Sequence, residues 1–186
     1  MRKHRILAIA LTIFIGASQL VLGQTVRFAM DGPRPATLDA LINFSSVIVE
    51  ATVESAYPIV DQQSPGLVYS DFSIRVNRVV KGSVASNQIA VHQAGGTVPG
   101  GKTAEPGGYS LMMPGERYIL FLDANPPPGL PNRGLPRYMI AAGFHGLAKV
   151  EGGQIVWSKG MPEAWKKSYG LRADELIAVI DKSQGR

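Results

Sequence analysis

The chain has 186 residues, contains no cysteine, and carries a formal net charge of +5 at neutral pH with histidine counted as neutral. Without cysteine it has no disulfide, thiolate metal site or thiol nucleophile. Its length suffices for one domain with a hydrophobic core.

The first 23 residues have the layout of a secretory signal peptide. Arg2, Lys3 and Arg5 precede an apolar run from Ile6 to Leu22, and compact residues follow at the positions that a signal peptidase reads. We expect cleavage after Gly23 and export to the periplasm or the medium. The alternative is an uncleaved membrane anchor, because the apolar run has the shortest length that can span a bilayer.

Most of the positive charge belongs to this leader. Residues 1–23 hold three of the 19 Lys and Arg residues and none of the 14 acids, so the mature balance is 16 − 14, or +2. No basic run remains in the mature chain. We therefore do not expect nucleic acid as a partner.

Next in the chain come an extended lead-in and a short helix. Residues 24–36 contain two prolines and no periodicity, whereas residues 37–46 begin with Thr37 as a helix N-cap. The apolar side of this predicted helix consists of Leu38, Leu41, Ile42 and Phe44.

Two long strands are predicted after the helix. Residues 46–56 alternate between apolar and polar side chains and are followed by Pro58, which we expect to end the strand. Residues 68–82 alternate in the same way, with Phe72 among the inward side chains and Asp71 on the face expected to be exposed. A long strand of this kind is common where a small barrel bends.

Several shorter elements complete the chain. Two long loops are expected at 93–109 and 124–136, since both segments are rich in Gly or Pro. The strands are expected at 88–93, 115–123, 137–142, 146–150 and 154–157, and a helix at 172–182. The order of elements predicts one mainly β domain over 37–186, a barrel or a sandwich with small flanking helices.

The first long loop contains a match to the phosphate-loop pattern, from Gly96 to Lys102 and Thr103. A working phosphate loop needs a helix that begins at the Lys-Thr pair. Here Pro106 and two glycines follow, which disfavours a helix. We therefore expect neither nucleotide nor any other cofactor, and we interpret the segment as a connection.

Candidate catalytic residues are scattered. The mature chain has two histidines, His92 in a predicted strand and His145 in a turn; we expect His92 to bond a neighbour and His145 to be exposed. A metal site would need both to converge with an acid such as Glu116 or Asp71. No elbow motif marks a nucleophilic serine. Metal and catalytic residues are therefore predicted to be absent.

Five aromatic residues could form a stacking surface on a barrel, as in barrels that bind nucleic acids. Because the mature chain is nearly neutral, it has no basic groove to accompany such stacking. We therefore expect these aromatic residues to be half-buried in the barrel. These residues are Tyr69, Tyr118, Tyr138, Trp157 and Trp165.

The stretches "SSVIVEATVES", "VYSDFSIRVNRVVKG", "QIAVHQAGG", "PGERYILFL" and "GLAKVEGGQIVW" resemble small exported bacterial domains of uncharacterised role. These are similar to the oligonucleotide/oligosaccharide-binding (OB) fold of tissue inhibitors of metalloproteinases and netrin modules. The resemblance implies a closed, five-stranded Greek-key barrel with flanking helices. The inhibitors act through an N-terminal cysteine that this chain lacks, so the resemblance implies no inhibitory activity.

The sequence thus predicts an exported, non-catalytic domain that binds a protein or another cell-envelope component through loops. The alternative is an extracytoplasmic hydrolase or metal-dependent enzyme that acts on an extracellular polymer. The candidate binding residues lie in the two long loops. They are Gly96, Lys102, Thr103, Tyr109 and Arg133. A membrane would be a partner only through an uncleaved leader.

Overall fold

The computed structural model describes residues 25–28, 34–60, 68–98, 100–101, 103–106, 110–125, 134–158, 161–162, 165 and 170–185. The expected signal peptide, residues 1–23, lies outside this part. The described chain forms ten strands, two α-helices and a short 3-10 helix, η1 (Gly143–Gly146). It is mainly β, as predicted.

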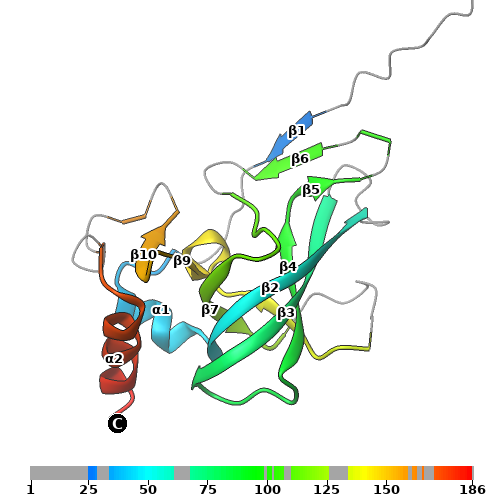
Figure 1. The fold of residues 1–186 in the computed structure, drawn as a ribbon. Coiled ribbons are helices and arrows are strands. Elements are labelled where there is room, and N and C mark those ends of the chain that lie inside the picture. Colours follow the sequence, from blue (N-terminus) through cyan, green and yellow to red (C-terminus); the bar gives the residue numbers. More distant parts are fainter. Residues whose placement is uncertain are drawn as a thin grey trace, which may run out of the picture.

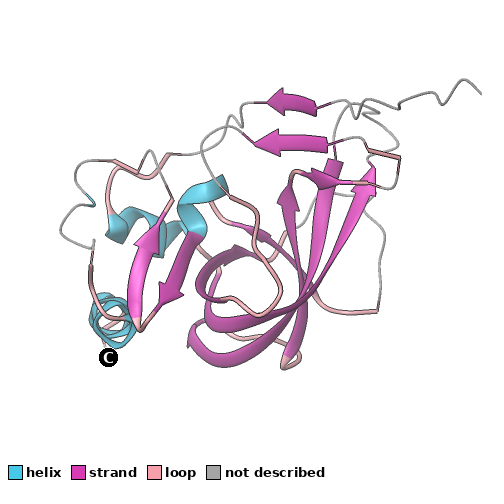
Figure 2. Ribbon diagram, turned by 45° about the horizontal axis from the view of Figure 1, so that its top comes forward, coloured by secondary structure: helices cyan, strands magenta, loops and turns pink. Residues whose placement is uncertain are grey.

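The main sheet has seven strands in the order β10-β9-β7-β2-β3-β4-β8, and β7 also pairs with β8. This pairing joins β7, β2, β3, β4 and β8 into a five-strand ring, whose strands curl around one another in Figure 2. Neighbours are antiparallel except β4 and β8, which are parallel. The strands are β2 (Val47–Val60), β3 (Val68–Lys81), β4 (Gln88–Ala94), β7 (Arg117–Asp123), β8 (Arg137–Ile140), β9 (Leu147–Glu151) and β10 (Gln154–Trp157).

A second, three-stranded sheet lies at one end of the molecule (Figure 1). Its strands are β1 (Thr25–Phe28), β6 (Thr103–Pro106) and β5 (Gly96–Thr97). β5 and β6 lie within 93–109, so the prediction of a long loop without strands there is wrong. β1 runs through the predicted extended lead-in and pairs with β6 in parallel.

β2 continues to Val60, although Pro58 was predicted to end it. Pro58 is paired with Ser70 of β3, whereas β7 pairs with β2 only from Val47 to Thr52. Among the described strands, none pairs with the second half of β2 on the side away from β3, so the missing N–H of proline interrupts no ladder there. Proline is tolerated in such edge positions.

The strands bury side chains in two clusters. In β7, Tyr118, Leu120 and Leu122 belong to one cluster, whereas Ile119 and Phe121 belong to the other. This explains why β7 is almost continuously apolar. The inner cluster comes mostly from the ring strands: Val47, Val49, Ala51, Val53, Phe72, Ile74, Ile89, Val91, Met112, Tyr118, Leu120, Leu122, Tyr138, Ile140 and Leu147.

The outer cluster joins the other face of the sheet to the helices. α1 (Leu38–Phe44) and α2 (Ala173–Ser183) lie beside β10 and β9 in Figure 1 and contribute buried apolar side chains. The predicted helices are both present. Leu41 and Ile42 of α1 are buried as expected, whereas Phe44, at the end of the helix, is exposed.

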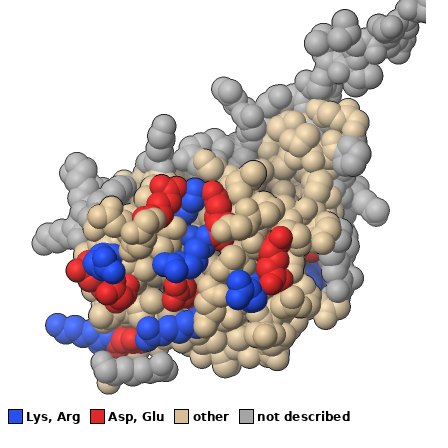
Figure 3. Space-filling model, viewed as in Figure 1, with Lys and Arg blue, Asp and Glu red and all other residues tan. Residues whose placement is uncertain are grey.

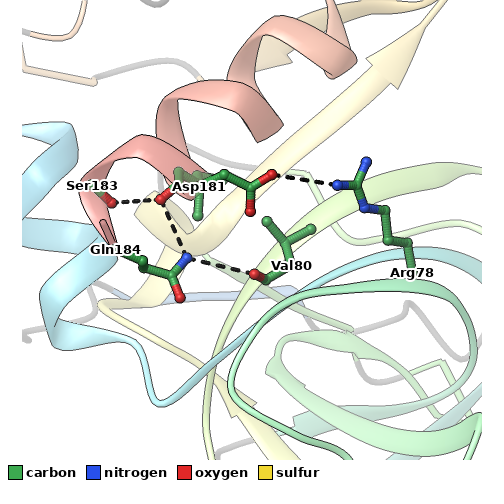
Figure 4. A network of polar contacts seen from close by, with 6 residues as sticks. Arg78, Val80, Asp181, Ser183 and Gln184 are labelled. Atoms are coloured by element: carbon green, nitrogen blue, oxygen red, sulfur yellow. Dashed lines mark hydrogen bonds and ion pairs between the residues drawn. The ribbon is translucent and has the colours of Figure 1, made fainter. Parts of the chain in front are cut away.

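Polar contacts fix both helices. The Thr37 hydroxyl accepts a hydrogen bond from the N–H of Ala40 at 3.1 Å and caps α1, as predicted. At the far end of α2, Gln184 donates to the carbonyl of Val80 at 3.5 Å, and Arg78 pairs with Asp181 at 3.4 Å (Figure 4). These contacts hold the end of α2 against β3. Neither helix has the length and hydropathy that a membrane crossing requires, and the same holds for every helix of the described chain.

Candidate functional site

An open cleft of about 630 Å³ lies beside the place where β7 pairs with β9. Tyr118 and Leu147 belong both to its wall and to the inner cluster, so the cleft borders the core of the ring. Its lining residues are Ser110, Leu111, Met113, Glu116, Tyr118, Leu147, Lys149, Glu151, Val156, Trp157 and Ser158.

A network centred on Glu116 forms the polar part of the cleft. One oxygen of Glu116 lies 2.5 Å from Nζ of Lys149, and the other accepts from the Tyr118 hydroxyl at 2.5 Å and the Met113 N–H at 3.1 Å. Lys149 also pairs with Glu151 at 2.7 Å. The network therefore links β7, β9 and the turn before β7.

Strand geometry explains how these side chains meet. Glu116 and Tyr118 are two residues apart, as are Lys149 and Glu151, so each pair points to one side of its strand. Tyr118 is the register partner of Lys149 in the antiparallel β7–β9 pair. Directly opposed residues have adjacent side chains, which places the ammonium of Lys149 beside the Glu116–Tyr118 pair.

The network fixes the charge states of its members. Burial raises the pKa of Glu116, but hydrogen bonds from Lys149 and Tyr118 outweigh it and lower the pKa below its usual value. Burial and the bond to Glu116 raise the pKa of Tyr118, and the bond to Glu116 raises that of Lys149. At neutral pH Glu116 is therefore ionised, Tyr118 is neutral and Lys149 is charged.

The walls of the cleft combine these polar groups with exposed apolar side chains. Met113 and Val156, which are 57% and 44% exposed, both line it. Large apolar side chains with this exposure, placed beside fixed charges in a hollow, are typical of a binding surface. Trp157 also contributes to the wall but is 5% exposed, because it packs edge-on against Trp165 at a centroid distance of 5.2 Å.

A second polar group lies on the ring, at β3, β4 and β8. Nδ1 of His92 lies 3.3 Å from a carboxylate oxygen of Asp71, its register partner, and Nε of Arg137 donates to Nε2 of His92 at 3.1 Å. Nε2 therefore lacks a proton and Nδ1 carries it, towards Asp71. Burial and the charge of Arg137 lower the pKa of His92 to about 4.

This arrangement confirms that His92 bonds a neighbour and corrects the expectation for Asp71. Asp71 is 2% exposed, although its place in the alternating pattern predicted an exposed side chain. The two partners that surround His92 come from β3 and β8. Asp71 is buried beside His92, and an alternation within one strand does not reveal a contact with the next strand.

His145 was predicted to be exposed, and this is wrong. The residue is 3% exposed, its Nδ1 lies 3.1 Å from the carbonyl oxygen of Ala142, and its ring stacks on Phe144 at a centroid distance of 4.2 Å. Burial lowers the pKa of His145. The packing of η1 against the outer cluster covers this turn.

The candidates for a metal site lie in three different surroundings. His92 contacts Asp71 and Arg137, Glu116 contacts Lys149 and Tyr118, and His145 packs among aromatic rings. Within the described ranges, no group of three or more His, Asp or Glu residues is arranged to hold a metal ion. Of the metal-site candidates, the structure pairs His92 with Asp71, whereas Glu116 and His145 have other partners.

The predicted binding-loop residues fall partly within the structure. Gly96 is buried in β5 with φ +142°. A Cβ there would lie 2.5 Å from the Ser70 hydroxyl, so a larger residue at this position would clash with Ser70. Thr103 begins the strand β6, whereas in a phosphate loop a helix would begin at this residue. The Thr103 hydroxyl lies 3.0 Å from the Thr97 hydroxyl. The remaining candidates, Lys102, Tyr109 and Arg133, lie outside the described residues.

The aromatic residues are mostly core residues and are more deeply buried than the half-buried positions that were predicted. Tyr118, Tyr138, Trp157 and Trp165 are buried, and Tyr69 is partly exposed. The two tryptophans and Phe121 contact one another in the outer cluster. Their faces are thus occupied by protein.

Sequence reasoning missed the cleft, although it considered Glu116 as a metal ligand. The signal was present in two strands: a Glu-x-Tyr pair at 116 and 118 and a Lys-x-Glu pair at 149 and 151. Only the β7–β9 register brings them together. No protein-family model matches the chain, and no curated protein gives a significant match.

Proposed function

We propose that the chain is an exported, non-catalytic binding domain, and that its ligand, a protein or another component of the cell envelope, occupies the cleft between the 110–118 segment and β9–β10. The observation that carries this proposal is the combination in one hollow of exposed apolar side chains with a charge network centred on Glu116. The leader sequence supports export.

The protonation states favour binding over catalysis. A general acid or base works best with a pKa near the operating pH. The pKa values of Glu116, Tyr118 and Lys149 are all shifted away from neutrality, and no histidine lines the described cleft. The network holds fixed charges, as a recognition surface requires.

The ring supports the proposed OB-like Greek-key barrel. β2, β3 and β4 are consecutive neighbours, and β7 returns by a long connection to lie beside β2, which is the 4-1-2-3 order of a Greek key. β8 then closes the ring against β4 and β7. The likeness to tissue inhibitors of metalloproteinases and netrin modules is proposed for the fold alone.

The surface charges support a protein or envelope ligand over nucleic acid or nucleotide. Figure 3 shows basic and acidic side chains interspersed on one face of the molecule, rather than a basic stripe. Several of these charges are paired, including Arg78 with Asp181 and Arg172 with Asp174. A surface of alternating charge gives little attraction to a polyanion.

The test is capture of the ligand from cell envelopes by the mature chain and by two matched variants. Val156→Arg places a charge on the cleft wall, whereas Val79→Arg makes the same change at a strand valine of similar exposure outside the cleft lining. We expect Val156→Arg to lose a partner that the mature chain and Val79→Arg both recover. Equal recovery by all three proteins would reject the cleft as the binding site.

A further inference from the structure

We infer that the ligand is a peptide segment that presents one cationic side chain beside aliphatic ones, with the cation bound at Glu151. This inference rests on the proposed function, since it specifies the occupant of the same cleft. It follows from the net negative charge of the lining residues and from the aliphatic side chains that are exposed beside them.

The cleft carries an uncompensated negative charge. Its charged lining residues are Glu116, Lys149 and Glu151, so two carboxylates and one ammonium leave a balance of −1. The shifted pKa values of Glu116 and Lys149 keep both groups charged at neutral pH. A cationic group complements this balance, whereas an anionic one would be repelled.

The excess charge is located on Glu151. Both oxygens of Glu116 are occupied, by Lys149 on one side and by Tyr118 and Met113 on the other. The Glu151 side chain is 53% exposed, and in the described part of the chain Lys149 is its one ion-pair partner. A carboxylate with free acceptor positions can bind an ammonium or a guanidinium directly.

The apolar walls favour aliphatic side chains over a sugar ring. Protein sites commonly bind flat ligand faces on exposed aromatic rings. Here Trp157 is 5% exposed, and the accessible apolar surface belongs to Met113, Val156 and the partly buried Leu111. Flexible aliphatic walls beside one carboxylate suit a peptide in which a basic residue is flanked by apolar ones.

The experiment uses three labelled, capped pentapeptides that have leucine at both ends and differ only at the central residue, which is lysine, norleucine or glutamate. Fluorescence anisotropy measures their affinity for the mature chain. We expect the lysine probe to bind at least about threefold more tightly than the norleucine probe, and the glutamate probe to bind most weakly. Salt should weaken the lysine probe selectively.

Two variants locate the effect. Glu151→Gln should reduce the affinity of the lysine probe to that of the norleucine probe, whereas Glu54→Gln removes a paired glutamate outside the cleft and should leave all affinities unchanged. Val156→Arg, which adds a positive charge to the cleft wall, should weaken the lysine and norleucine probes. Melting temperatures close to that of the unmodified chain would show that the variants remain folded.

Three results would overturn the inference. Equal binding of lysine and norleucine probes, both lost in Val156→Arg, would reject the cation while leaving the cleft as a binding site. A lysine preference that survives Glu151→Gln would place the cation elsewhere. Failure of all three probes to bind would reject the peptide class, and the envelope capture would then decide the proposed function independently.

Discussion

Gly146 shows how a single backbone position shapes the wall of the core. A Cβ at this residue would lie 2.5 Å from the carbonyl oxygen of Ala141, 2.7 Å from Cγ2 of Ile140 and 2.8 Å from the carbonyl oxygen of Phe121. Two of these atoms are backbone, which does not move aside as a side chain does. Glycine is therefore required here by close packing of η1 against β7 and β8.

Gly146→Ala should lower the free energy of unfolding by about 2–3 kcal/mol, because the added methyl overpacks the site. The control is Gly152→Ala, where nothing lies within 4 Å but φ is +58°, so that left-handed strain alone should cost about 1 kcal/mol. Urea denaturation measures both. A loss no greater for Gly146→Ala than for the control would contradict the packing described.

His92 makes stability depend on pH. Its pKa is lowered to about 4 in the folded protein by burial and by Arg137, and Asp71 faces its other nitrogen. Between pH 6.5 and 4 the unfolded chain therefore binds a proton at His92 that the folded chain does not. Above pH 6.5 the titration of His92 leaves the free energy of unfolding unchanged. As the pH falls from 6.5 to 4, it lowers the free energy of unfolding.

The native protein should lose about 3 kcal/mol through His92 between pH 7 and pH 4, added to losses from other groups. In His92→Gln this part of the pH dependence is absent, even though the variant is less stable at pH 7. Urea unfolding at pH 7, 6, 5 and 4 tests it. Equal pH dependence in both proteins would mean that His92 titrates normally.

At the scale of elements, α1 depends on a contact from the sheet. A helix of seven residues is too short to be stable alone. Nζ of Lys81, at the end of β3, donates to the carbonyls of Ile42 at 2.5 Å and Ser45 at 2.8 Å. The ammonium satisfies carbonyls that the end of α1 leaves free and complements its dipole.

Lys81→Met keeps most of the aliphatic stem but removes these two bonds, and should cost about 1–2 kcal/mol of unfolding free energy. Lys182→Met, in the last turn of α2, is the control, because Lys182 is exposed and is expected to contribute less than about 0.5 kcal/mol. Chemical denaturation monitored by circular dichroism compares them. If Lys81→Met lowers the free energy of unfolding no more than Lys182→Met does, α1 does not depend on the ammonium of Lys81.

The strands were predictable because alternation with period two is visible locally. Val47, Val49, Ala51 and Val53 are buried together, and the turn at Gly152 and Gly153 joins β9 to β10 as expected. For Pro58 and Asp71, where prediction failed, the deciding contact was distant in sequence. The continuation through Pro58 depends on where the pairing with β7 ends.

The candidate site was less predictable than the fold. Glu116 and Lys149 are 33 positions apart, and their contact depends on the register of β7 with β9. The burial of Asp71 likewise requires His92 on the next strand and Arg137 on a third. A single sequence contains these side chains but not the pairing that assembles them.

At the scale of the whole molecule, the two clusters replace the disulfides that many exported domains use. The outer cluster is held together by α2, through Leu176, Ile177 and Ile180. Covering the outer face of the sheet removes apolar surface from water on both sides of β7. A cysteine-free chain obtains its stability from this burial and from strand pairing.

Leu176→Ala should lower the unfolding free energy by about 2–5 kcal/mol, since the side chain is fully buried and its removal leaves a cavity. Val179→Ala, on the exposed side of the same helix, should change it by less than about 0.5 kcal/mol. Thermal and urea unfolding provide the comparison. Similar small effects at both positions would mean that α2 does not cover the core.

The central claim is that a ligand enters the cleft, and site-specific photo-crosslinking in intact cells tests it most directly. A photoreactive amino acid at Met113 lies on the cleft wall, whereas one at Phe44, which has comparable exposure, does not line the cleft. We expect a discrete adduct at Met113 that is lost when Val156→Arg is added, and none at Phe44. No adduct at Met113, or the same adducts at both positions, would contradict it.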